Sequence, residues 1–178
     1  DAMRGAAASV AVMVGVSVGC MANAGSGDGP SRDHGYAVKK SEAQWKAALS
    51  EQAYRVLRQG GTERAFTGEL WDHHGDGVYV CGGCGQPLFD SEAKFDSGTG
   101  WPSFYRPIRA DAVETHRDTT LGMVRTEVRC SRCGGHQGHV FKDGPPPTGL
   151  RYCINSAALD FRSKTSTSTR PARPSPGR

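Results

Sequence analysis

Residues 81–85 read Cys-Gly-Gly-Cys-Gly, and residues 130–134 read Cys-Ser-Arg-Cys-Gly. Both stretches have the Cys-x-x-Cys spacing of metal-binding knuckles, although they lie far apart in the chain. Four thiolates satisfy the tetrahedral coordination of Zn²⁺ and leave no position open for a substrate. We therefore predict one structural Zn²⁺ per chain, which ties two distant loops together and supports the small core of the domain. Its ligands would be Cys81, Cys84, Cys130 and Cys133.

Three other interpretations of the two knuckles stay open at this point. A pair of disulfides is compatible with an exported protein, although two identical spacings favour a metal. The knuckles could also catalyse thiol-disulfide exchange themselves, or they could form a zinc ribbon that grips a protein or a nucleic acid. Nucleic-acid binding is disfavoured because acidic residues nearly balance basic ones between Cys81 and Cys133, so the basic surface that it needs is not indicated.

The sequence around the knuckles is typical of a mainly β protein. From residue 60 to residue 161, glycine, proline, aspartate and asparagine recur between short apolar runs, for example at residues 78–80, 123–129 and 152–154. This pattern predicts short antiparallel strands, with no alternating helices that would suggest a parallel sheet. Before them, Ser41 is followed three residues later by Gln44, a capping-box pattern that predicts one or two short helices up to residue 57.

The first 24 residues are predicted to be a secretory signal peptide. Arg4 precedes an apolar run over residues 6–19, and Ala22-Asn23-Ala24 has the small-x-small form of a cleavage site. Cys20 follows a glycine, which permits a lipoprotein signal as the alternative. We therefore expect an exported protein, periplasmic or secreted, or one tethered to a membrane through Cys20.

The rest of the 178 residues leaves room for one domain. Residues 25–40 have too few apolar groups for a core and are predicted to form a flexible linker. The domain would occupy residues 41–162, and the tail at residues 163–178, rich in Ser, Thr, Pro and Arg, would be disordered. The tail carries much of the net charge of +4. The folded part is therefore near neutral, and we expect no nucleic-acid partner.

Cys153 stands apart from both knuckles, and a zinc shell of four cysteines does not need it. If its segment is a strand, the side chains of Arg151, Cys153 and Asn155 project from one face. Nearby cations and hydrogen-bond donors lower the pKa of a thiol and make it a better nucleophile. A buried structural cysteine is the alternative, but it leaves these polar neighbours without a purpose. The pattern favours a reactive thiol.

Two further segments carry candidate chemistry. His136, His139 and Asp143 lie within eight residues of one another, and histidines move protons near neutral pH. They are not needed as metal ligands if the cysteines complete the shell. Trp101 and Phe104 flank a tight turn, where they are either core residues or the wall of an apolar pocket for a methyl group.

Four motifs together identify a resemblance to the B-type methionine sulfoxide reductases. They lie at residues 81–84, 97–104, 136–141 and 151–156, and the likeness covers about residues 41–161. It implies two small antiparallel sheets, a single domain and no organic cofactor. It also implies reduction of the R epimer of methionine sulfoxide in proteins, or of the free amino acid, in the repair of oxidised proteins.

The resemblance also assigns roles to individual residues. Cys153 would attack the sulfoxide sulfur and become a sulfenic acid, with Trp101 receiving the substrate methyl group. Arg151 and Asn155 would organise the thiolate. His139, the first choice for proton donor, would lie with His136 and Asp143 around the sulfoxide oxygen. Phe141 and Ser103 would contact the substrate.

Two positions depart from the family pattern. Thr99 stands where many members carry a second, resolving cysteine, which implies recycling by an external thiol, either a thioredoxin-like protein or a small thiol. Gln137 stands where an aliphatic residue is common, so the resemblance does not define the edge of the pocket. The expected partners are oxidised proteins and this reductant, and the expected state is a monomer.

Overall fold

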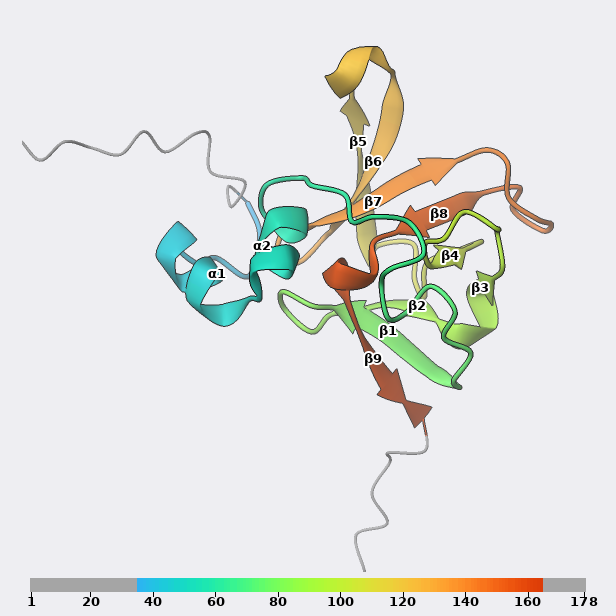
Figure 1. The fold of residues 1–178 in the computed structure, drawn as a ribbon, viewed down its shortest axis with the longest axis horizontal. Helices are drawn as coiled ribbons and strands as arrows, with labels where there is room; N and C mark the ends of the chain where they lie inside the picture. The colour runs from blue at the N-terminus through green and yellow to red at the C-terminus, as the bar shows by residue number, and fades with distance from the viewer. Residues whose placement is uncertain (1–34, 165–178) are drawn as a thin grey trace, which may run out of the picture. The chain divides into compact units, whose positions relative to one another are not determined.

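The computed structural model describes residues 35–164. The predicted signal peptide at residues 1–24 lies outside this range, as do most of the linker and of the tail. Within it, two short helices precede nine strands (Figure 1). No helix among these residues is long and apolar enough to cross a membrane.

Both helices begin at a serine cap. α1 (Glu42–Ala48) has the predicted capping box: Ser41 Oγ accepts from the Gln44 N–H at 3.2 Å, and Gln44 Oε1 accepts from the Ser41 N–H at 2.8 Å. α2 (Glu51–Leu57) starts from Ser50 in a similar way, with its hydroxyl accepting from the N–H of Ala53. Each helix is too short to be stable alone. Trp45 and Leu57 anchor them in the core.

The strands form two antiparallel sheets, which confirms the predicted fold class. The three-stranded sheet has the order β2-β1-β9 and contains β1 (Gly77–Cys81), β2 (Pro87–Asp90) and β9 (Leu159–Ser163). The six-stranded sheet has the order β3-β4-β8-β7-β6-β5. Its strands are β3 (Lys94–Phe95), β4 (Ser103–Phe104), β5 (Val113–Asp118), β6 (Arg125–Cys130), β7 (His136–Phe141) and β8 (Arg151–Ile154).

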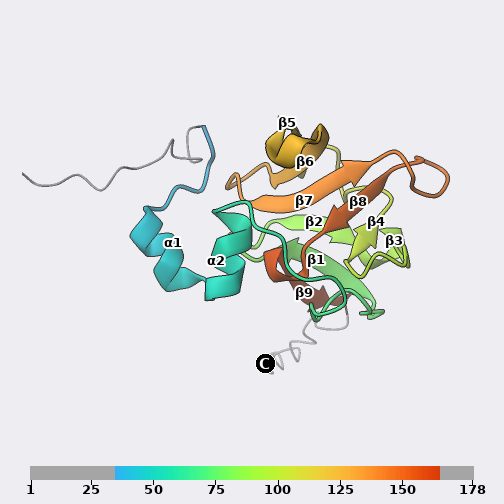
Figure 2. The same ribbon diagram turned by 45° about the horizontal axis from the view of Figure 1, so that its top comes forward.

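Aromatic side chains hold the two sheets together. Figure 2 shows the three-stranded sheet below the six-stranded one. Phe89 of β2 stacks on Phe104 of β4 with ring centroids 4.4 Å apart, and Tyr79 of β1 meets Phe104 edge-on at 5.0 Å. Such pairs add about 0.5–1.5 kcal/mol beyond the burial of their area. Phe104 is therefore a core residue, the first of the two roles considered for it.

Two boundaries differ from the sequence expectation. β6 begins at Arg125 rather than at the start of the apolar run, since Met123 and Val124 are 52% and 70% exposed at the turn between β5 and β6. Residues at the end of the predicted linker contact the domain. The Val38 N–H donates to the carbonyl of Arg132 at 3.0 Å, and the Tyr36 hydroxyl donates to Glu114.

Candidate active site and metal centre

The four knuckle cysteines form one cluster. Cys81 and Cys130 end β1 and β6, and Cys84 and Cys133 lie in the turns that follow. All four sulfurs lie within 4.8 Å of one another. Cys81 Sγ is 3.7 Å from Cys133 Sγ, and Cys84 Sγ is 3.6 Å from Cys130 Sγ.

These distances fit a tetrahedral thiolate site. A metal–sulfur distance of about 2.3 Å, usual for zinc, gives sulfur–sulfur edges of about 3.8 Å. A disulfide needs about 2.05 Å, and the four cysteines are free thiols in the structure. The two-disulfide alternative therefore does not describe this structure. The cluster could bind a metal ion that joins a knuckle of the three-stranded sheet to a knuckle of the six-stranded sheet.

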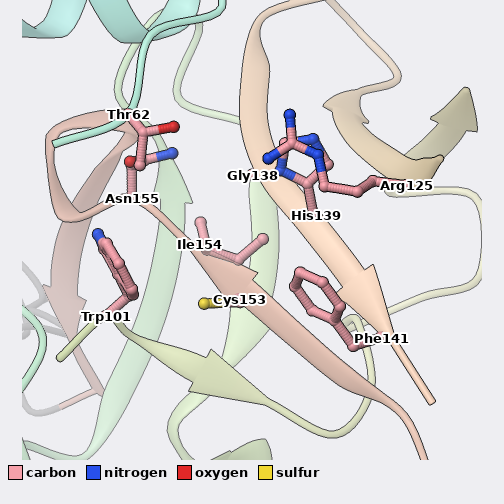
Figure 3. Close-up of a pocket in the computed structure, with 9 residues that line it drawn as sticks. All are labelled: Thr62, Trp101, Arg125, Gly138, His139, Phe141, Cys153, Ile154 and Asn155. Atoms are coloured by element: carbon pink, nitrogen blue, oxygen red, sulfur yellow. The ribbon is translucent and has the colours of Figure 1, made fainter. Parts of the chain in front are cut away.

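Cys153 lies on β8, in the middle of the six-stranded sheet. It pairs in register with Ser103 of β4 on one side and with His139 of β7 on the other. In Figure 3 its sulfur lies between the rings of Trp101 and Phe141. The pocket that contains it is lined by Thr62, Trp101, Arg125, Gly138, His139, Phe141, Cys153, Ile154 and Asn155. The sheet thus brings Cys153, His139, Trp101, Phe141 and Asn155 to one pocket.

The environment of the Cys153 thiol differs from the sequence expectation. Burial raises its pKa above the ordinary value, and this outweighs the opposing effects of the Thr99 hydroxyl, the Arg151 guanidinium and the Ser103 hydroxyl. Thr99 Oγ1 lies 3.9 Å from Cys153 Sγ. Polar neighbours are thus present, as predicted, but they do not bring the pKa below its usual range. The free protein therefore holds Cys153 mainly as a thiol at neutral pH.

A pH profile of Cys153 alkylation tests this balance. The rate of reaction with iodoacetamide should still be rising above pH of about 8.5, the usual thiol pKa, because only the thiolate reacts. Thr99→Val removes a donor to the thiolate, so the pKa should rise further. At pH 7.5 alkylation should then be about 5-fold slower, the factor for one hydrogen bond of about 1 kcal/mol. Thr67→Val, on a hydroxyl that contacts Arg64, is the control. A plateau below pH 7, or faster alkylation of the Thr99 variant, would refute the balance.

Arg151 is held by two interactions beside the nucleophile. Its guanidinium makes two hydrogen bonds to the Asp143 carboxylate, at 2.9 and 2.7 Å, and lies 4.5 Å from the centre of the Phe141 ring. This geometry is the bidentate form in which Arg–carboxylate pairs are strongest. The prediction grouped Asp143 with the histidines, but its carboxylate bonds Arg151, so it orients the guanidinium.

The two histidines are each bound to a carboxylate that the sequence did not single out. His139 Nε2 lies 2.8 Å from Asp118 Oδ2, and His136 Nδ1 lies 2.6 Å from Glu127 Oε1. The ring centroids of the two imidazoles are 5.4 Å apart. His139 lines the pocket of Cys153, whereas His136 lines an adjoining groove with Arg129. Only His139 therefore shares a pocket with Cys153.

The surroundings of His139 favour its neutral form. Burial is the main cause that lowers its pKa, with help from Arg125 and His136, and the hydrogen bond to Asp118 only partly compensates. The pKa of Asp118 lies well below its usual range because of hydrogen bonds from Thr120 and His139. An ionised Asp118 accepts hydrogen bonds, so His139 carries its proton on Nε2. Nδ1 of the neutral ring is then free to accept a proton.

Glu127 is also ionised. Burial alone would raise its pKa, but hydrogen bonds from His136 and Arg129 outweigh burial and lower the pKa to about 2. Asp118 and Glu127 lie on neighbouring strands, and each also binds an arginine, Arg125 at 2.8 Å and Arg129 at 2.7 Å. The alternation of Arg125, Glu127 and Arg129 along β6 was a sequence signal for Glu127 as a charged residue on this face, since alternate residues share a face of a strand. Neither its histidine partner nor the role of Asp118 on β5 follows from that pattern.

Asn155 is fixed by main-chain groups. Its Oδ1 accepts from the Glu63 N–H at 3.0 Å, and its Nδ2 donates to the Gln137 carbonyl at 2.9 Å. Glu63, which sequence reasoning missed as a site residue, also accepts from the indole of Trp101 through its carbonyl at 3.2 Å. Its carboxylate accepts hydrogen bonds from the backbone N–H groups of Ser156 and Ala157. Asn155 and Trp101 are thus positioned by one buried residue.

Ser103 and Gln137 lie outside the pocket lining. Ser103 is buried beside Cys153, and its hydroxyl contacts Ser97 Oγ at 2.7 Å and the Trp101 carbonyl at 3.2 Å. Ser103 therefore supports the loop that carries Trp101. The side chain of Gln137 points to the cysteine cluster, with Nε2 3.5 Å from Cys81 Sγ. The departure from the family pattern at Gln137 thus concerns the cysteine cluster and not the pocket edge.

Comparisons with known proteins agree with this site. The family described as the SelR domain matches residues 49–163. A protein of Thiobacillus denitrificans is 68% identical over 125 residues, which cover 70% of this chain and 95% of that protein. Proteins of a Synechococcus species and of Leptospira interrogans are each 57% identical, over 72% and 71% of this chain and 94% and 97% of their own lengths. All three are named peptide methionine sulfoxide reductase MsrB. The chain therefore belongs to the MsrB-type family of methionine sulfoxide reductases.

Proposed function

We propose that this protein reduces the R epimer of methionine sulfoxide to methionine, in oxidised proteins and as the free amino acid, and so repairs oxidised proteins. The observation that carries the proposal is the position of the Cys153 thiol. It lies in one pocket with an aromatic wall, Trp101 and Phe141, and a buried histidine, His139. The relatives named above support the same chemistry.

Transfer of the sulfoxide oxygen to Cys153 needs no proton from solvent, because the thiol itself supplies the proton. The Cys153 sulfur attacks the sulfoxide sulfur, and the sulfur–sulfur bond formed in the attack breaks as the oxygen leaves the substrate and bonds to Cys153, which gives methionine and a sulfenic acid. The substrate sulfur is reduced by two electrons and the cysteine sulfur is oxidised by two. The proton that leaves the thiol ends on the transferred oxygen. Neutral His139 suits the transfer, since Nδ1 accepts the thiol proton and then donates it to the oxygen.

The two sides of the pocket support selection of one epimer. The sulfoxide sulfur is chiral, and its methyl group and oxygen need different surroundings. Trp101 and Phe141 offer an apolar surface for the methyl group, while His139 and Arg125 offer polar groups for the oxygen. A substrate of the opposite configuration, with its main chain in the same place, would exchange the two groups and leave the oxygen against an aromatic ring.

Turnover of the separated epimers tests the proposed function. A peptide that carries either the R or the S sulfoxide is incubated with the protein and a dithiol reductant, and methionine formation is measured. We expect only the R peptide to be consumed. Equal rates for both epimers, or preference for the S peptide, would contradict the proposal.

Recycling of the sulfenic acid is proposed to need an external thiol, of a thioredoxin-like protein or a small molecule. Among the described residues, every cysteine other than Cys153 belongs to the metal cluster. Thr99, whose hydroxyl is 3.9 Å from Cys153 Sγ, has no thiol to offer. After one turnover without reductant, the sulfenic acid should therefore persist.

Thr99→Cys should convert the protein to one that forms an internal disulfide. The hydroxyl that the new sulfur replaces lies 3.9 Å from Cys153 Sγ, so a small shift reaches the bond length of about 2.05 Å. Peptide mapping after one turnover should show the pair of residues 99 and 153 in this variant. The unsubstituted protein should show no disulfide at Cys153. A bond from Cys153 to a native cysteine would disprove this recycling scheme.

The metal of the cysteine cluster is proposed to be Zn²⁺, one per chain, with a structural role. All-thiolate ligation and the tetrahedral spacing support zinc. When bound, the metal supplies a cross-link between the two knuckles. Because four thiolates complete its shell, no ligand position remains for the substrate.

Export is proposed from the segment at residues 1–24, with its apolar run and Ala22-Asn23-Ala24 site. An exported reductase would meet the methionines of other exported proteins. Mass spectrometry of the mature protein tests this. We expect a start near Gly25, or a lipid on Cys20 in the tethered alternative, and retention of Met3 in cytosolic protein would contradict export.

A monomer is proposed as the functional unit, since one chain supplies the whole pocket, and light scattering would test it.

A further inference from the structure

Gln137 lies between the cysteine cluster and the active strand. It is fully buried in β7, at 0% exposure. Its Nε2 donates to Cys81 Sγ at 3.5 Å and to the Gly135 carbonyl at 3.2 Å, while its Oε1 has no hydrogen-bond partner. Its main-chain carbonyl accepts hydrogen bonds from the backbone N–H and from the side-chain Nδ2 of Asn155, each at 2.9 Å. One residue thus touches the metal cluster and the residue two positions beyond the nucleophile.

The burial of this amide calls for a compensating interaction. A buried carbonyl oxygen without a partner costs about 1–3 kcal/mol, and an aliphatic side chain of similar size would avoid that cost. A hydrogen bond to a charged acceptor is about twice as strong as one between neutral groups. Four thiolates around a divalent cation leave a net charge of about −2 on the cluster. Cys81 is itself buried, so its sulfur depends on protein donors rather than on water.

We propose that Gln137 is a metal-retaining residue, whose side-chain N–H stabilises the metal-bound Cys81 thiolate. The proposal rests on the metal site proposed above. Groups that hydrogen-bond to metal ligands orient them and tune their affinity, and loss of such a group costs about 10- to 100-fold in metal affinity. Gln137 is such a group, because its side-chain N–H donates to the sulfur of Cys81. An aliphatic residue at this position has no donor.

The rate of metal release tests the proposal. The zinc-loaded protein is mixed with a chromophoric chelator, and release is followed in the native protein, Gln137→Met and Gln137→Leu. Both substitutions remove the amide N–H and C=O groups. Methionine keeps the length of glutamine, and leucine is a shorter, branched aliphatic side chain. We expect release about 10-fold faster or more in both variants. Tyr79→Phe is the matched control, because Tyr79 lies on the same strand as Cys81. This substitution removes a hydroxyl that donates to the His73 carbonyl, away from the cysteine cluster. Its release should match that of the native protein.

Cobalt substitution gives a second readout that does not depend on activity. A donor to a thiolate lowers the energy of the sulfur lone pair, so its loss should shift the sulfur-to-cobalt charge-transfer band to longer wavelength in both Gln137 variants. Equal release rates, or a band that stays in place, would overturn the role of Gln137. A native protein that is folded and active without any metal would instead overturn the metal site itself, so the two failures are distinguishable.

Discussion

Cys153→Ser is expected to abolish sulfoxide reduction, with a loss of at least about 1,000-fold in turnover, the scale seen when a covalent nucleophile is removed. A serine hydroxyl is a much weaker nucleophile than a cysteine thiol, even with a histidine in the same pocket, and it does not take up the sulfoxide oxygen as a stable product. The measurement is methionine release from an (R)-sulfoxide peptide with excess dithiol.

The same variant separates a catalytic from a structural cysteine. Cys153 is half-buried in β8, and its Sγ lies 3.9 Å from the Thr99 hydroxyl. Serine fits this position, so circular dichroism, melting temperature and metal content should stay close to those of the native protein. Substantial remaining activity would refute the mechanism. Loss of activity together with loss of the fold would favour the structural alternative.

Removal of the metal is expected to unfold the domain. The cluster joins the end of β1 in one sheet to the end of β6 in the other through Cys81 and Cys130. Structural zinc binding in small domains contributes about 10–16 kcal/mol, whereas the whole stability of a domain is about 5–15 kcal/mol. Without the metal, the four thiols lose the cross-link that joins the two sheets.

Circular dichroism during chelation under reducing conditions measures this effect. We expect loss of the β signal in the metal-free protein and recovery when Zn²⁺ is added back, with one metal per chain by elemental analysis. A metal-free protein that keeps its melting temperature would show that the cluster is dispensable for the fold.

Local patterns in the sequence predicted the parts of the site that depend on spacing. The four cysteines of the cluster came from two identical knuckles, and the start of α1 came from Ser41 and Gln44. The same-face argument placed Arg151 and Cys153 together, and the structure pairs Cys153 with His139 across the sheet. Short-range chemistry and strand alternation were sufficient for these.

The partners of the histidines depend on pairing between distant strands, which the sequence does not reveal. Asp118 reaches His139 because β5, β6 and β7 are neighbours, and an irregularity between Val128 and Arg129 sets the register of β6 against β7. Glu63 comes from a loop far from Asn155 in the chain. The direction of the Cys153 pKa shift was also missed, because burial outweighs the polar neighbours and is a property of the folded chain.

A single turnover without reductant tests the central claim most directly. Reduced, metal-loaded protein is mixed with excess (R)-sulfoxide peptide, and both the methionine formed and the protein mass are measured. The account predicts one methionine per chain and one added oxygen on Cys153, trappable by a nucleophilic dione, with no new disulfide. Methionine formed without oxidation of Cys153, or oxygen found on a cluster cysteine instead, would contradict it.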